Sequence, residues 1–276
     1  MTSIQMLTSL SPRIRRTLLN ADVGIELQRD CVTSARAAFG NCTSLNFIEE
    51  RETLTALYPD LQFAFLGSME KSPFPYPLMA IRKLQAFAER HPNFTHVGII
   101  NADIYVRRTR PQVMAHIIDE PDAVFIFTRQ ESINLAHSSR VPYIHGFDLM
   151  ILPRNYFLTL ALNGLALGVP WWDYAVPLIA LFQGRKVYAS TGADLRHMTH
   201  PQTWNLDLWN AGLKALFAAL NQNCGRDHPL RSWSEIMGDY LNKPLRGHQH
   251  DSMLYSGGTL FARQCHKTIF KSVKVI

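Results

Sequence analysis

The sequence predicts an α/β protein built on a doubly wound, mainly parallel sheet. Short apolar runs alternate with amphipathic segments from residue 3 to residue 100, and parallel neighbours need such crossover helices. The run Val97 to Ile100 is apolar throughout, as expected of a strand buried on both faces. The 276 residues, 47% hydrophobic and 18% charged, are typical of a globular protein with a sizeable core.

The elements of the first half follow in a regular order. Strands are expected at 3–10, 43–47, 61–66 and 97–100, and helices at 23–39, 48–57 and 78–90. Gly40 is a natural C-cap for the first helix, while Pro59 and Pro92 follow the ends of the other two.

Beyond Asp103 the alternation is less regular. We expect helices at 113–118 and 155–167, strands at 123–128 and 147–152, and a helix within a Trp-rich segment that leads to a last strand near 186–189. The C-terminal part predicts helices at 206–221 and 232–241. Without a repeat or a low-complexity linker, the chain is expected to form one domain over 1–205, with a helical extension over 206–276 packed on it.

Charge and cysteine content exclude several classes of function. The net charge is +6 and the pI about 9.2, but the basic residues are dispersed and form no stripe interleaved with aromatics, so no nucleic-acid partner is expected. The four cysteines have no metal-binding spacing, which favours reduced thiols in a cytoplasmic protein. No apolar stretch reaches the ~20 residues that a bilayer requires, so no transmembrane segment is expected.

Polar residues follow the predicted parallel strands at the edge where α/β proteins bind ligands. They are Thr8, Ser9, Asn46, Asn101 and Asp103, with Gly67 and Ser68 after the third strand. A carboxylate in this place suits a divalent cation, Mn²⁺ or Mg²⁺, that bridges nucleotide phosphates. The alternative for Asp103 is a turn or helix-capping residue.

Two later segments also carry candidate residues. In His145-Gly146-Phe147-Asp148 a glycine permits close approach of the backbone to a ligand, and Asp148 could orient a sugar hydroxyl, act as a base, or cap a turn. Trp171 and Trp172 precede Asp173, a composition suited to stacking on a sugar or base beside an acid. The two indoles could equally fill the core beneath a loop.

The stretch HMTH places two histidines after the last predicted strand. His197 or His200 could complete a metal site with Asp103; the alternative is that both are structural. The chain has no GxxxxGK[ST] phosphate loop, no GxGxxG after the first strand and no GxSxG elbow. These absences argue against P-loop NTPases, dinucleotide oxidoreductases and α/β-hydrolases.

Six segments together resemble a family of bacterial proteins with a nucleotide-diphospho-sugar transferase fold of the GT-A type. They are TSLSPR, SLNFIEE, INADIYV, HGFDLMILPR, VPWWDYAVPL and HMTHPQTWN, within residues 3–205. NADI stands where the family has DxD, whose last Asp binds the cation; here the first position is Asn101. The resemblance implies that Asp103 and a histidine of HMTH hold the metal.

The resemblance also implies the remaining roles. Thr8, Ser9 and Asn46 would line the nucleotide pocket, and Asp148 or Asp173 would face the acceptor. The expected function is metal-dependent transfer of a sugar from a nucleotide-diphosphate sugar to a hydroxyl of a glycan or small molecule.

Three other functions are weighed against this one. A non-catalytic nucleotide-sugar-binding protein is the main alternative, because Asn101 replaces an acid. A sugar-phosphate nucleotidyltransferase is disfavoured because no GGxGTR-like loop follows the first strand. A glycosidase that uses Asp148 and Asp173 as paired carboxylates stays open.

Overall fold

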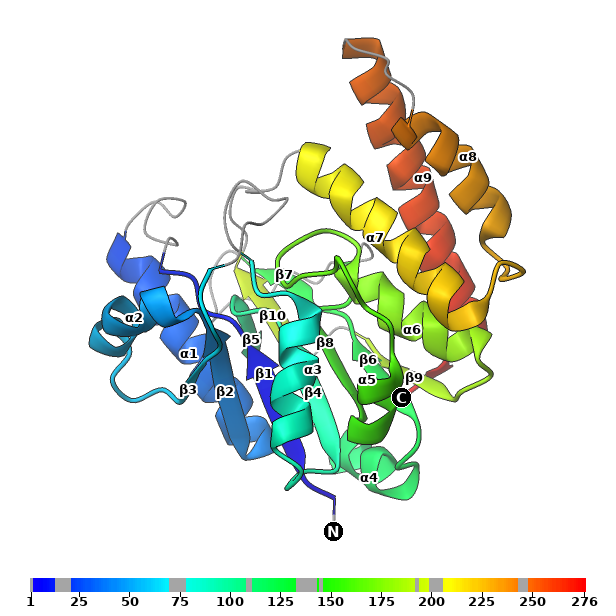
Figure 1. Ribbon diagram of the computed structural model, residues 1–276. Helices are drawn as coiled ribbons and strands as arrows, with labels where there is room; N and C mark the ends of the chain where they lie inside the picture. Colours follow the sequence, from blue (N-terminus) through cyan, green and yellow to red (C-terminus); the bar gives the residue numbers. More distant parts are fainter. Residues whose placement is uncertain are drawn as a thin grey trace.

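The computed structural model describes residues 2–12, 21–69, 78–107, 111–132, 143, 146–191, 194–198, 206–242 and 248–276. Within these ranges an eight-stranded sheet forms the centre of the molecule (Figure 1). Its order is β11 (Lys274–Val275), β9 (Val187–Ser190), β6 (Val124–Phe127), β8 (Leu149–Pro153), β4 (His96–Ile100), β1 (Ile4–Thr8), β2 (Asn41–Asn46) and β3 (Phe63–Phe65). All neighbours are parallel except β8, which is antiparallel to β4 and β6. The predicted fold class is confirmed.

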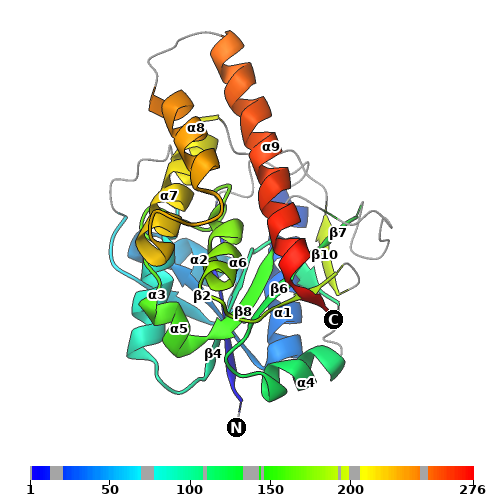
Figure 2. The same ribbon diagram turned by 90° about the vertical axis from the view of Figure 1, so that its right-hand side faces the viewer.

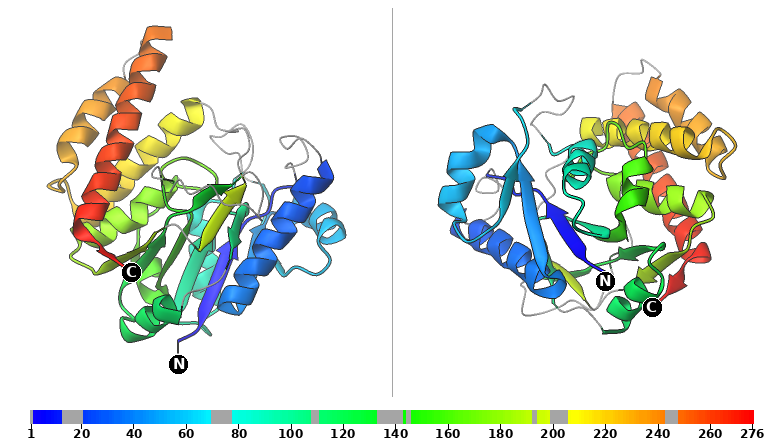
Figure 3. Two further views of the ribbon diagram at one scale, coloured as in Figure 1. Left: turned by 180° about the vertical axis from the view of Figure 1, so that it is seen from behind. Right: turned by 60° about the horizontal axis from the view of Figure 1, so that its bottom comes forward.

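Helices cover both faces of this sheet because its strands carry apolar side chains on alternate sides. Met6 packs on one face and Leu7 on the other. The Met6 face is covered by α1 (Ala21–Phe39), by α2 (Arg51–Leu57), which follows a short 3₁₀ turn η2 (Ile48–Glu50), and by α4 (Pro111–Asp119). The Leu7 face is covered by α3 (Ile81–Arg90), α5 (Arg154–Thr159) and α6 (Trp172–Phe182). The left view of Figure 3, seen from behind, shows the blue helix α1 lying over the Met6 face of the sheet.

A second, smaller sheet was not predicted. It consists of β5 (Ile104–Val106), β10 (Leu195–Met198) and β7 (Gln130–Ser132), with β10 antiparallel to β5 and parallel to β7. Strands of three or four residues are too short for a period-2 pattern to be recognised. This sheet matters for the site, because its register pairs His197 with Ile104 on one side and with Glu131 on the other.

Three helices form the C-terminal extension: α7 (Leu206–Cys224), α8 (Arg231–Asn242) and α9 (His248–Ser272). α7 and α9 pack against α6, and α8 packs against α7 and α9. Figure 2 shows α9 running along the body and rising beyond it. Phe261 and Ile269 of α9 belong to the same hydrophobic core as the β-strand residues Val97 and Ile126. The division at residue 205 stays a prediction.

The sequence predicted two of these three helices. It missed α9, because Gly257 and Gly258 and the polar residues before them break any apolar period. The predicted helix 155–167 is wrong in its second half: α5 ends at Thr159, and Gly164 adopts a φ of 79°. None of the described helices combines the length and the hydropathy needed to cross a bilayer.

Candidate functional site

The antiparallel strand β8 brings polar residues from both of its neighbours to one edge. β4 and β6 end at this edge, whereas β8 begins there, directly after Asp148. The Asn101 N–H donates to the Asp148 carbonyl at 3.2 Å, and the Asp148 N–H donates to the Phe127 carbonyl at 3.2 Å. Asn101, Asp148 and the segment after Phe127 therefore meet at the carboxyl edge of the parallel strands, where α/β proteins bind ligands.

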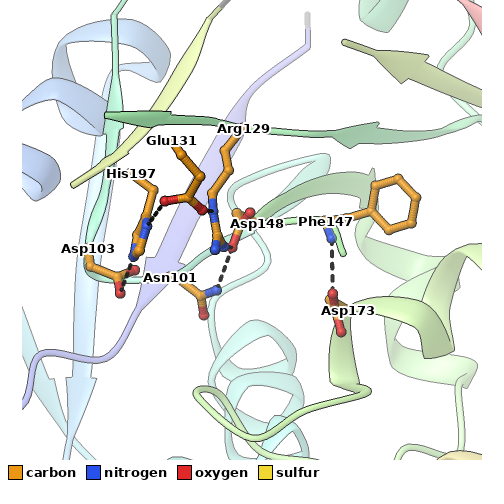
Figure 4. Close-up of polar contacts among 8 residues, drawn as sticks. All are labelled: Asn101, Asp103, Arg129, Glu131, Phe147, Asp148, Asp173 and His197. Carbon is orange, nitrogen blue, oxygen red and sulfur yellow. Dashed lines mark hydrogen bonds and ion pairs between the residues drawn. The ribbon is translucent and has the colours of Figure 1, made fainter. Parts of the chain in front are cut away.

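Six polar side chains form a continuous set of contacts across this edge, which we call the polar chain (Figure 4). In order they are Asp103, His197, Glu131, Arg129, Asp148 and Asn101. His197 lies between two carboxylates, with Nε2 3.4 Å from Asp103 Oδ2 and Nδ1 3.0 Å from Glu131 Oε2. The small sheet produces this arrangement by holding β10 between β5 and β7.

The two carboxylates determine the charge of His197. Burial alone would lower the pKa of the imidazole, but hydrogen bonds with Asp103 and Glu131 outweigh burial and raise its pKa to about 9. Burial would raise the pKa of the Glu131 carboxyl, yet His197 and Arg129 lower it to about 2. Without a bound cation, His197 is therefore an imidazolium at neutral pH.

Arg129 links the two ends of the polar chain. Its Nε donates to Glu131 Oε1 at 2.8 Å and its Nη1 to Asp148 Oδ1 at 2.6 Å, while its guanidinium carbon lies 3.7 Å from the centroid of the Tyr143 ring. The Asn101 amide donates to the same Asp148 oxygen at 3.1 Å. Burial opposes the charge of Arg129, but the surrounding carboxylates raise its pKa above the ordinary value. One planar guanidinium thus fixes two acids at once.

Sequence reasoning missed Arg129 and Glu131, although the signal was present. RQES follows the predicted strand 123–128 directly, and the rule that selected Asn101 and Asp103 applies equally to the end of this strand. What the sequence could not show is that Glu131 faces His197, because that contact depends on the unpredicted pairing of β10 with β7.

The arrangement of Asp103 and His197 fits a divalent cation. Octahedral bonds of about 2.1 Å place adjacent ligands roughly 3 Å apart, close to the 3.4 Å between Asp103 Oδ2 and His197 Nε2. The other ring nitrogen faces Glu131, and a metal-binding histidine commonly gives this nitrogen's proton to a carboxylate. A cation would replace the proton on Nε2. Within the described ranges, no group of three or more His, Cys, Asp or Glu side chains is arranged to hold a metal ion.

Asp148 presents a carboxylate oxygen with no hydrogen-bond partner among the described residues. The residue is only 3% exposed, and its Oδ1 accepts from Arg129 and Asn101. Its buried Oδ2 accepts from no described group. A buried acceptor in this state costs free energy unless a donor reaches it, so Oδ2 suits a ligand that donates a hydrogen bond.

Asp173, in the first turn of α6, has unusual proton affinity. Its Oδ2 accepts the Phe147 N–H at 3.0 Å. The pKa of the carboxyl is raised to about 7, mainly by burial. The hydrogen bond from Phe147 lowers the pKa, and the negative charge of the nearby Asp148 raises it further. Near neutral pH this group is therefore present in both its protonated and its ionised form, as a general acid or base requires.

Gly146 permits the close contact between Asp173 and the loop before β8. Its φ is 149°, a region that side chains with a Cβ rarely adopt. A Cβ at this position would overlap Asp173 Oδ2. The sequence expectation that this glycine permits close approach to a ligand is refined, since the group that approaches it is a carboxylate of the chain itself.

The predicted nucleotide-binding residues after β1 and β2 lie deeper than expected. Thr8 is fully buried, and its hydroxyl has no hydrogen-bond partner in the described part of the chain. Asn46 is also fully buried, and its amide donates to the Leu10 carbonyl at 2.7 Å and to Glu50 Oε2 at 3.0 Å. Asn46 therefore holds the loop after β1, whereas Ser9 is half-buried beside it. Their contact with a nucleotide stays a prediction.

The two tryptophans lie in the hydrophobic core. Trp171 is 2% exposed and Trp172 4%, so neither indole presents an open face to a sugar. The structure thus favours the core interpretation over stacking. Trp209 of α7 and Phe261 of α9 pack against the Trp171 ring, and the sequence alone could not predict that these helices pack there. The predicted roles of His145 and His200 fall outside the described residues.

Neither a protein-family profile nor a curated protein sequence matches this chain. Among solved structures, it is similar to a protein from Desulfovibrio desulfuricans G20 assigned as a nucleotide-diphospho-sugar transferase. That likeness has 12% identity and a TM-score of 0.41, and it covers 87% of this chain and 97% of the other.

Two further solved structures show the same degree of likeness. The inositol-1-phosphate CTP transferase of T. maritima has 12% identity, a TM-score of 0.46 and coverage of 78% and 96%. A Mycobacterium tuberculosis H37Rv protein in complex with manganese has 12% identity, a TM-score of 0.38 and coverage of 78% and 98%. What this chain does must be inferred from its own side chains.

Proposed function

We propose that this protein is a glycosyltransferase that uses a divalent cation, Mn²⁺ or Mg²⁺, to transfer a sugar from a nucleotide-diphosphate sugar to an acceptor hydroxyl. The observation that carries the proposal is the polar chain. At one end Asp103 and His197 can hold a cation. At the other, Asp148 has a carboxylate oxygen with no hydrogen-bond partner among the described residues, with Asp173 nearby. A transferase needs both a group that stabilises the departing diphosphate and a group that receives the acceptor proton.

The donor end of the site is assigned to Asp103 and His197. A bound cation would supply Lewis-acid stabilisation of the negative charge that develops on the diphosphate. Glu131 orients His197 by accepting a hydrogen bond from Nδ1, which leaves Nε2 directed towards Asp103. Arg129 in turn fixes Glu131. The chain therefore positions both cation ligands before a substrate arrives.

The acceptor end is assigned to Asp148 and Asp173. Asp148 Oδ2 can accept a hydrogen bond from a hydroxyl of the acceptor, which holds that molecule in place. In an inverting reaction, ionised Asp173 can take the proton of the attacking hydroxyl, because its pKa of about 7 lies near the operating pH. The acceptor oxygen then forms the new bond to the sugar as the bond to the diphosphate breaks.

Asn101 supports an alternative in which the protein binds a nucleotide sugar without turning it over. Its amide donates to Asp148 Oδ1 at 3.1 Å. The first position of the NADI motif therefore faces Asp148 at the acceptor end of the site, and it adds no second acid to the proposed cation site. A cation site with one carboxylate and one histidine binds more weakly than one with two acids.

The cytoplasmic location expected from the cysteines is still a prediction.

A binding and turnover experiment tests the proposal. The full chain is incubated with UDP-, GDP- and CMP-sugars, with Mn²⁺, with Mg²⁺ or with EDTA, and its melting temperature and the release of free nucleotide are measured. We expect one donor to raise the melting temperature only when a cation is present. Asp103→Ala should abolish that rise, whereas His116→Gln, which changes a half-buried histidine on α4 outside the polar chain, should leave it intact.

Each other outcome identifies a different function. Stabilisation that survives both EDTA and Asp103→Ala, without nucleotide release, would favour the binding protein. Hydrolysis of a simple glycoside without any nucleotide would favour the glycosidase. Absence of stabilisation by every nucleotide, with and without cation, would contradict the glycosyltransferase proposal.

A further inference from the structure

Phe147 connects the two carboxylates at the acceptor end of the site. Its N–H donates to Asp173 Oδ2 at 3.0 Å, and it directly precedes Asp148 in the chain. Figure 4 shows this N–H directed at the Asp173 carboxyl. The Phe147 side chain is 1% exposed, so the position of this backbone donor depends on whatever packs around the ring.

The Phe147 ring is packed mainly by the C-terminal helix α9. Its centroid lies 6.2 Å from the His266 ring and 6.0 Å from the Phe270 ring, both nearly parallel to it. Tyr174 of α6 also meets the Phe147 ring, edge-on at 5.9 Å. Offset and edge-on aromatic contacts of this kind restrict a ring in several directions. The ring of Phe147 is thus held between α6, which carries Asp173, and α9.

Trp171 provides a second connection between the C-terminal helices and Asp173. It stands at the N-cap of α6, two residues before Asp173, with a φ of 83° in the left-handed region. A tryptophan keeps this conformation only where its surroundings impose it. Its Nε1 donates to the Trp209 carbonyl of α7 at 3.1 Å, and its ring lies 5.5 Å from that of Phe261 in α9.

We propose that α7 and α9 are positioning elements of the catalytic centre: through Phe147 and Trp171 they hold the Asp173 carboxyl in place and keep water away from it. This inference deepens the proposed function, on which the catalytic role of Asp173 rests. Phe147, Trp171 and Phe270 are positioning residues, since they act through Asp173. The C-terminal extension is then part of the reaction centre.

The state of the Asp173 carboxyl reports on this positioning. Burial is the largest cause of its raised pKa, so a variant that admits water should lower that pKa towards the ordinary carboxyl value. Five titratable or charged groups interact electrostatically with the Asp173 carboxyl. They are Asp148, Arg129, Tyr143, Tyr174 and Cys265. All of these are retained in the variants below.

The test is a ¹³C NMR titration of aspartate carboxyl carbons in the full chain. The Asp173 signal is assigned by its loss in Asp173→Asn. In Phe270→Ala we expect its titration midpoint to fall by on the order of one unit. Leu260→Ala is the matched control, because Leu260 lies on the same helix but is 55% exposed; its midpoint should equal that of the unaltered protein.

Two milder variants keep the test decisive if Phe270→Ala does not fold. Phe270→Leu retains an apolar side chain, and Trp171→Phe retains a ring but loses the hydrogen bond to the Trp209 carbonyl. We expect a smaller fall in the Asp173 midpoint in each. An unchanged midpoint in both variants, when folded, would overturn the proposal.

The titration requires no substrate, so the two proposals fail separately. A protein that transfers sugar but shows an unchanged Asp173 midpoint in every folded variant contradicts only the role of α7 and α9. A protein that shifts its midpoint as expected but transfers no sugar contradicts only the proposed function. If both hold, the acidic limb of the kcat profile should move with the midpoint in Phe270→Leu.

Discussion

His197 and Glu131 are joined by a 3.0 Å contact between Nδ1 and Oε2, across neighbouring strands of the small sheet. The contact fixes which ring nitrogen faces Asp103 and makes the imidazole a cation when no metal is bound. One residue pair thus has two effects: it orients the imidazole, and it places a positive charge between two carboxylates. In the proposed function, the same contact would orient His197 as a metal ligand.

The first prediction concerns the stability of metal-free His197→Gln. Because the folded protein raises the pKa of His197 from 6.5 to about 9, its stabilisation is fully present below pH 6.5 and is lost as the pH rises through 9. We expect the variant to be destabilised by about 1–3 kcal/mol near pH 6 and by much less near pH 10. Urea unfolding at both pH values measures this.

His116, which is half-buried on α4 and lies outside the polar chain, supplies the control for this prediction. His116→Gln should change the free energy of unfolding by no more than about 1 kcal/mol. A destabilisation of His197→Gln that stays the same from pH 6 to pH 10 would show that the imidazolium is not what stabilises this part of the fold.

The second prediction compares two arginines that each contact two carboxylates. Arg129 has 14% of its side chain exposed, and Arg231, which pairs with Asp227 and Glu235, has 51% exposed. Arg129→Met should cost roughly 3 kcal/mol, because it leaves the buried Asp148 carboxylate without a counter-charge. Arg231→Met should cost much less, because water and salt screen the ion pairs of an exposed side chain. Equal losses in chemical denaturation would contradict the linking role of Arg129.

The third prediction concerns Asp173→Asn. Folding raises the pKa of this acid from 3.8 to about 7, so the folded state favours the protonated form. We compare the free energy of unfolding of the unaltered protein with that of Asp173→Asn. The difference in favour of the unaltered protein should be largest below about pH 4, decrease as the pH rises towards 7, and stay constant above pH 7. Unfolding curves of both proteins between pH 4 and pH 8 test this.

The same substitution tests catalysis. If Asp173 receives the acceptor proton, Asp173→Asn should lower kcat by about 10²- to 10⁴-fold while the cation-dependent rise in melting temperature with the donor persists. Loss of donor binding together with kcat would place Asp173 at the donor end of the site.

The fourth prediction separates backbone strain from lack of space at Gly146. Gly146→Ala meets both problems, because φ is 149° and a Cβ would overlap Asp173 Oδ2. Gly184→Ala meets only the first, with a φ of 73° and no atom within 4 Å of the added Cβ. We expect Gly184→Ala to cost about 1 kcal/mol and Gly146→Ala clearly more. Melting temperatures that fall equally would contradict the close contact with Asp173.

The sequence by itself determined the α/β class, most of the central strands and the edge at which the site lies. These features follow from local causes: apolar runs and helical periods give the elements, and the polar residues after β4 and before β8 locate the ligand-binding edge. Asn101, Asp103, Asp148 and His197 were found in this way, and the structure brings all four into the polar chain.

Only the tertiary structure decided what those residues contact. The pairing of β10 with β7 places Glu131 against His197, although the two are 66 positions apart, and no local pattern encodes such a distant contact. The packing of α7 and α9 buries Trp171, and burial together with Asp148 shifts the pKa of Asp173. Residue type and spacing indicated that a carboxylate stands at this edge. Its protonation and its role depend on neighbours that only the folded chain supplies.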